Sequence, residues 1–109
     1  MPKEDRRIIF TFEEAYKAIY SLSAQKDIKK PPAGEVVKIN KDENDDSVIY
    51  MHLDNKQEKW EQQRKLEYSR DFIAAALMLY CRGCGIPLPK SAKKSVVLGS
   101  TNIILRVEI

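Results

Sequence analysis

The stretch Phe72–Cys81 reads FIAAALMLYC and carries no charged side chain at any of its ten positions. Alanine, leucine and methionine favour a helix, and a helix that is apolar on every side is expected at the centre of a domain. We therefore expect this segment to be the interior element against which a sheet packs. A small sheet and one further helix would not cover it fully, which also favours self-association.

The same helix is expected to begin well before this stretch and to run from about 55 to 82. Asp54 can cap its start, because an aspartate accepts hydrogen bonds from the first turn of a helix. The first half is polar apart from Trp60 and Leu66, so it would bury only a narrow stripe. Trp60 is then either an anchor over the sheet or an exposed interface residue. A glycine at Gly83 is a natural helix terminator.

Runs of β-branched and aromatic residues predict the strands. Two of them flank a long polar loop and two flank a short turn, which predicts two hairpins. A further short run near the start of the chain predicts a first strand. These segments are 6–10, 35–39, 47–53, 94–98 and 103–109.

Thr11 and Glu14 have the spacing of a capping box, in which each side chain binds the backbone N–H of the other residue. Apolar residues at helical spacing follow, so a first amphipathic helix is predicted over about 12–23. Residues 24–34 form a Pro-rich connector that cannot continue this helix. Residues 1–5 are expected to be a disordered, charged leader.

Together these elements predict a single α+β domain over residues 1–109, in the order (β)αββαββ. The expected architecture is a mostly antiparallel sheet of about four to five strands with two helices packed on one face. No internal repeat with a period of about 20–50 residues is visible in the sequence.

Composition limits the class of protein. The chain has 109 residues, 43% of them hydrophobic, and a formal charge of +3, which fits one ordinary core rather than a disordered or histone-like chain. Apolar runs are too short to span a membrane, and no signal-peptide core follows Met1. We expect a small cytoplasmic protein of bacterial type.

Cys81-Arg82-Gly83-Cys84 is a CxxC motif, which can serve thiol chemistry or supply half of a zinc site. Reactive dithiols are favoured where a helix begins, whereas this motif lies where one ends. Zinc needs four ligands, and His52 is the only histidine of the chain. Cys81, Cys84 and His52 are therefore weak metal candidates, and the expected role of the cysteines is structural.

Five basic residues near the end of the chain are the other candidate site. Lysine and arginine beside a hairpin can follow the phosphates of a nucleic acid, although residues 82–109 contain no aromatic side chain for base stacking. Lysines beside a strand also protect sheet edges from aggregation. The residues are Arg82, Lys90, Lys93, Lys94 and Arg106.

No catalytic residues or cofactor are predicted. The four glycines form neither GxGxxG nor GxxxxGK[ST], and the GxSxG and HExxH motifs are missing from the sequence. The function that we expect is a non-catalytic binding domain for a protein partner or for a second copy, engaged through a sheet edge or the polar half of the long helix. The alternatives are binding of nucleic acid or another polyanion through the basic residues, and a CxxC thiol or zinc protein.

Overall fold

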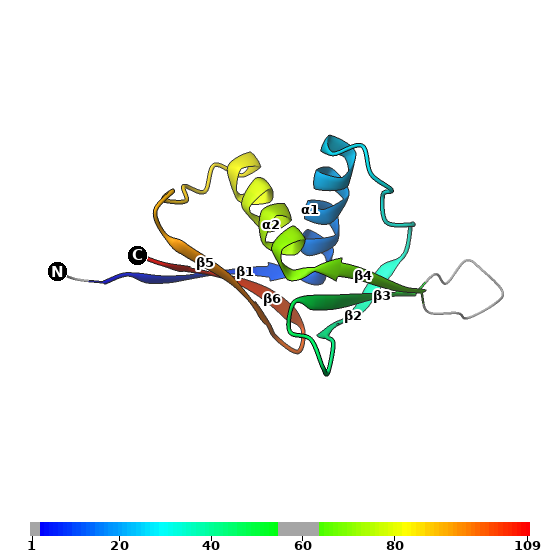
Figure 1. Cartoon of the computed structure of the whole chain (residues 1–109). Coiled ribbons are helices and arrows are strands. Elements are labelled where there is room, and N and C mark those ends of the chain that lie inside the picture. The colour runs from blue at the N-terminus through cyan, green and yellow to red at the C-terminus, as the bar shows by residue number, and fades with distance from the viewer. Residues whose placement is uncertain (1–2, 55–63) are drawn as a thin grey trace.

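The computed structural model describes residues 3–54 and 64–109, in which two helices lie on one side of two antiparallel sheets (Figure 1). Strand order is β1-β6-β5 in the first, here called sheet A, and β2-β3-β4 in the second, sheet B. The predicted α+β class is confirmed, but the predicted element order and the single four- to five-stranded sheet are wrong. The elements are β1 (Asp5–Thr11), α1 (Phe12–Gln25), β2 (Glu35–Lys41), β3 (Val48–Asp54), β4 (Arg64–Ser69), α2 (Arg70–Gly83), β5 (Lys93–Leu98) and β6 (Asn102–Glu108).

The strand missing from the prediction is β4, which occupies part of the segment expected to be the first half of the long helix. Leu66 and Tyr68 are half-buried and alternate with exposed neighbours, which is the two-residue period of a strand. Pairing with β3 along its whole length provides hydrogen-bond partners for its backbone. Residues 55–63, which include the interface candidate Trp60, lie outside the described residues.

At the start of the chain, α1 begins where predicted but runs on to Gln25, two residues into the expected Pro-rich connector 24–34. The capping box is confirmed, since Thr11 Oγ1 accepts from Glu14 N–H at 3.1 Å and Glu14 Oε1 accepts from Thr11 N–H at 2.9 Å. The hydrogen bond from the Thr11 backbone is the main reason that the pKa of Glu14 is lowered. Strand β1 begins at Asp5, inside the segment expected to be a leader, and Asp5 pairs with Arg106.

The chain consists of two βαββ halves whose helices correspond at a spacing of 58 residues. Both helices have 14 residues, and Thr11 and Ser69 cap them in the same way. After each helix comes one residue in the left-handed conformation, Asp27 (φ 53°) and Gly85 (φ 74°). Buried helix positions recur at the same spacing, as the pairs Ala15 and Ile73, Ala18 and Ala76, and Ile19 and Leu77 show.

Each sheet combines strands from both halves. Strand β1 of the first half pairs with β6 of the second, and β4 of the second half pairs with β3 of the first. Neither half therefore contains a complete three-stranded sheet. The two halves depend on each other for the hydrogen bonds of their leading strands.

The core lies between the two helices and the inner faces of the sheets. The segment Phe72–Cys81 is helical, as predicted, but only one of its faces is fully buried. The other side chains of this segment are partly exposed, because α2 lies with α1 in an outer layer rather than inside the molecule (Figure 1). The fully buried side chains are Ile73, Ala76, Leu77 and Cys81. Neither of the helices described here is long and apolar enough to cross a bilayer.

Ser23 occupies in α1 the position that Cys81 occupies in α2, and both side chains are 0% exposed. Among the described residues, Ser23 Oγ has no hydrogen-bond partner. Replacing Ser23 with cysteine should raise the free energy of unfolding by about 1 kcal/mol, because the cost of burying an unpaired hydroxyl is removed. Urea unfolding under reducing conditions measures this, with Ser21→Cys on the exposed side of α1 as the control. A loss of stability in Ser23→Cys would show that the hydroxyl contributes to folding.

Candidate binding faces

Both helices pack on the same side of the sheets, so the opposite, outer faces are open in the part of the chain that the structure describes (Figure 1). On sheet A the register places Ile9 opposite Ile104 and Ile104 opposite Val97. Ile9 is 62% exposed and Val97 is 44% exposed, with Ile104 half-buried between them. These three side chains form an apolar row across the outer face of sheet A.

The charged side chains beside the apolar row largely neutralise one another. Arg106 Nη2 lies 2.8 Å from Asp5 Oδ2, and Arg106 Nη1 lies 3.5 Å from Glu108 Oε1. The hydrogen bond from Arg106 lowers the pKa of Asp5 and raises that of Arg106 itself. Lys93 stands opposite Glu108, and Arg7 stands opposite Arg106. Two acids and three bases thus share this end of the face.

One sequence signal could have located the apolar row. Alternation in the last strand places Ile104 on the same face as Arg106 and Glu108, where an isoleucine is unexpected. Ile9 and Val97 join it only through the strand register. The prediction from sequence therefore missed the row.

The five basic residues predicted as a nucleic-acid site do not share one face. Lys93 and Lys94 are neighbours in β5 and point to opposite sides of sheet A. Arg106 lies on the outer face but is paired with acids, whereas Arg82 is exposed at the end of α2. Lys90 is exposed in the loop before β5. The structure therefore divides this group between several surfaces.

Of the three weak metal candidates, the two cysteines lie together at the end of α2, and His52 lies elsewhere. Cys81 is buried and Cys84 is exposed, and both are free thiols. Burial, with a smaller contribution from Cys84, raises the pKa of the Cys81 thiol and so disfavours the thiolate. His52 projects from β3 on the outer face of sheet B. Within residues 3–54 and 64–109 no group of three or more His, Cys, Asp or Glu side chains is placed to hold a metal ion.

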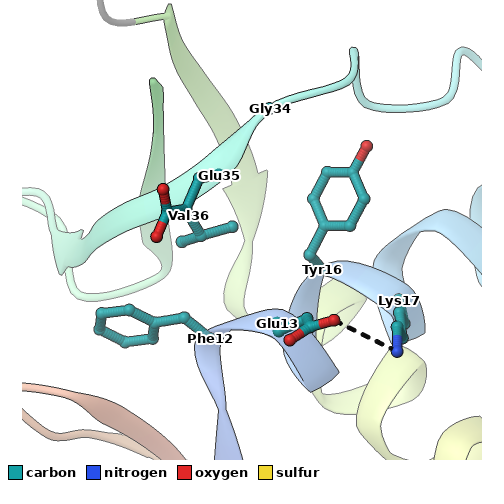
Figure 2. Close-up of a pocket in the computed structure, with 7 residues that line it drawn as sticks. All are labelled: Phe12, Glu13, Tyr16, Lys17, Gly34, Glu35 and Val36. Carbon is teal, nitrogen blue, oxygen red and sulfur yellow. Dashed lines mark ion pairs between the residues drawn. The ribbon is translucent and has the colours of Figure 1, made fainter. Parts of the chain in front are cut away.

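A pocket of about 570 Å³ lies between the first half of α1 and the start of β2 (Figure 2). Phe12 and Tyr16 supply aromatic surface from the helix, and Glu35 lies across from them on the strand (Figure 2). Tyr16 Oη donates to Pro32 O at 2.9 Å, and Lys17 is bound to a neighbouring glutamate of the helix at 3.4 Å. The described residues that line it include no serine, cysteine or histidine, so they offer surface for binding rather than a nucleophile and its base. The residues that line it are Phe12, Glu13, Tyr16, Lys17, Gly34, Glu35 and Val36.

A scan against protein-family models, a search of curated proteins and a search of solved structures each found no match to this chain.

Proposed function

We propose that the protein is a non-catalytic binding module that associates with a second copy of itself through the outer face of sheet A. The observation that carries the proposal is the apolar row Ile9–Ile104–Val97, which runs across all three strands of the sheet. A solvated antiparallel sheet normally presents polar side chains on its open face. An apolar row at this place favours contact with another protein surface.

The charges around the row favour a second copy as the occupant. In a two-fold dimer the same patch meets itself, so unpaired charges of one sign would repel across the interface. Here Arg106 is paired with Asp5 and Glu108 inside each chain. On the other side of the row, toward the opposite end of the face, lies the uncharged pair Thr11 and Asn102. The two acids and three bases of the face leave a net charge of one positive unit on each copy. Two such faces can therefore meet with only this small repulsion, whereas a highly charged partner would find little opposite charge.

The double substitution Ile9→Thr with Val97→Thr should weaken self-association at least about tenfold, because two apolar side chains no longer leave water. Both side chains point away from the core, so folding should be preserved. Sedimentation equilibrium measures the change against the monomer mass of 12.6 kDa. Val37→Thr is the control, since Val37 is 41% exposed but lies on β2 of sheet B.

Two results would overturn the proposal. One is a wild-type protein that remains monomeric up to ~1 mM, where even a weak specific dimer would be seen. The other is a double variant that associates as tightly as the wild type and the Val37→Thr control.

A further inference from the structure

Three basic side chains form a second row, on the outer face of sheet B. The register places Lys38 of β2 opposite His52 of β3, and His52 opposite Lys65 of β4. Residues directly opposite across antiparallel strands have Cβ atoms about 5 Å apart, and like charges at that distance destabilise the sheet. Burial, followed by the charges of Lys38 and Lys65, lowers the pKa of His52, so the three groups are electrostatically coupled.

Sheet A has a corresponding row, in which the central charge is compensated. Through the correspondence of the two halves, Arg106 occupies the place of His52, and Arg7 the place of Lys65. Arg106 is bound by Asp5 and by Glu108, as described above. The central residue of the row in sheet A is therefore paired with acids of the chain itself.

In sheet B no carboxylate of the described residues forms an ion pair with Lys38 or Lys65. The ammonium of Lys65 instead lies 3.9 Å from the centroid of the Tyr50 ring. Equivalent positions in the two halves thus differ in one respect. Arg106 is held in ion pairs within the chain, whereas none of the ion pairs among the described residues involves Lys38 or Lys65. Asp42 is the described acid that interacts with Lys65, since the hydrogen bond from Tyr50 and, to a smaller extent, the charge of Lys65 lower the pKa of Asp42. A bound anion would supply the direct ionic partner that the two lysines lack.

The contact of the histidine ring with Asn40 indicates which ring nitrogen takes the second proton. His52 Nε2 lies 2.7 Å from Asn40 Oδ1, an acceptor, so Nε2 carries the proton of the neutral ring. A second proton is therefore added at Nδ1. Protonation turns Nδ1 into a charged donor in the same row as the two lysines.

We propose that Lys38, His52 and Lys65, aligned across sheet B, bind the oxyanion of a phosphate group, whether of a phosphorylated small molecule or of a nucleic-acid backbone. Two ammonium groups and an imidazolium are strong, charge-assisted donors to such an oxyanion. This site lies on the other sheet from the proposed self-association surface and does not depend on it.

The first test follows His52 by NMR as pH is varied, with sulfate as the probe because sulfate does not titrate in this range. Sulfate should raise the pKa of His52 by about half a unit or more relative to chloride at equal ionic strength. By linkage, sulfate should bind more tightly as the pH falls through the pKa of His52. The charged groups that face the ring are Lys38 on β2, Lys65 on β4 and Asp54 on its own strand, with Glu35 and Glu67 diagonal to it.

The matched variants are Lys38→Gln with Lys65→Gln, and Arg7→Gln in the equivalent row of sheet A. The double variant should lose the sulfate-dependent shift, and its His52 pKa should rise without sulfate because two neighbouring cations are gone. Arg7→Gln should leave both values as in the wild type. A wild-type pKa that responds equally to sulfate and chloride would overturn the proposal, as would a sulfate response that survives in the double variant.

A second titration distinguishes the source of the phosphate group, using inorganic phosphate and a single-stranded oligothymidylate. If the resonances of the three residues shift at a far lower concentration of oligonucleotide than of phosphate, the site binds a nucleic-acid backbone. Binding should then weaken steeply as the salt concentration is raised. Equal sensitivity per phosphate would assign it to a small phosphorylated ligand. If neither titrant moves these resonances, the site does not bind phosphate groups.

Discussion

Replacing Leu77 with alanine is expected to lower the free energy of unfolding by about 2–5 kcal/mol, which is a large part of the stability of a domain of this size. Leu77 is 0% exposed and belongs to the buried face of α2. The loss combines the transfer free energy of the removed methyl groups with the cost of the cavity that they leave. Urea unfolding followed by circular dichroism measures it.

Two further substitutions show whether α2 has one buried face, as described. Ile19→Ala, at the equivalent place in α1 and 1% exposed, should cost a similar amount. Leu79→Ala, on a half-buried side of α2, should cost less than half as much. If Leu77→Ala and Leu79→Ala were equally destabilising, α2 would be buried all round, as its composition alone predicts.

Cutting the chain between Asp54 and residue 55 is expected to abolish cooperative folding of either fragment. In residues 1–54, β1 has lost its partner β6, and in residues 55–109, β4 has lost its partner β3. Each fragment also loses about half of the shared core, and small chains have little stability to spare. Each fragment at low micromolar concentration should therefore show no cooperative unfolding transition.

Mixing the two fragments in equal amounts should restore the transition, because all pairings between β1 and β6 and between β3 and β4 become available again. Circular dichroism and the dispersion of NMR resonances report the recovery. A fragment 1–54 that folds alone as a monomer would contradict the exchange of strands between the halves.

Local sequence signals accounted for most of the elements. The capping box at Thr11 and Glu14 placed the start of α1, and the polar loops placed both hairpins. These features depend on interactions between residues that are close in sequence, so the sequence alone is enough to predict them. Strand β4 was missed because its few apolar residues, Leu66 and Tyr68, also suit a helix with a narrow buried stripe. Its pairing with β3 decides between the two, and a single sequence does not show that pairing.

The arrangement of the two halves could not be predicted from the sequence either. Their correspondence rests on kinds of position, such as a capping hydroxyl at Thr11 and Ser69 or a left-handed residue at Asp27 and Gly85, rather than on shared residues. The spacing of 58 residues is also longer than the repeats that usually form arrays.

Both candidate surfaces depend on strand register. Ile9 and Ile104 are 95 positions apart in sequence and become neighbours only when β1 pairs with β6. Lys38 and Lys65 meet His52 only because β3 lies between β2 and β4. The basic residues chosen from the sequence were close in the chain instead, and alternation along β5 separated Lys93 from Lys94.

An isotope-filtered NOE experiment on a mixture of ¹³C-labelled and unlabelled protein tests the central claim most directly, since it detects contacts between copies atom by atom. The proposed dimer predicts intermolecular NOEs from the methyl groups of Ile9, Ile104 and Val97. Intermolecular NOEs that arise instead from the partly exposed side of α2, such as Ala75 and Leu79, would contradict it. So would the absence of intermolecular NOEs from Ile9, Ile104 and Val97 at concentrations where the protein is dimeric.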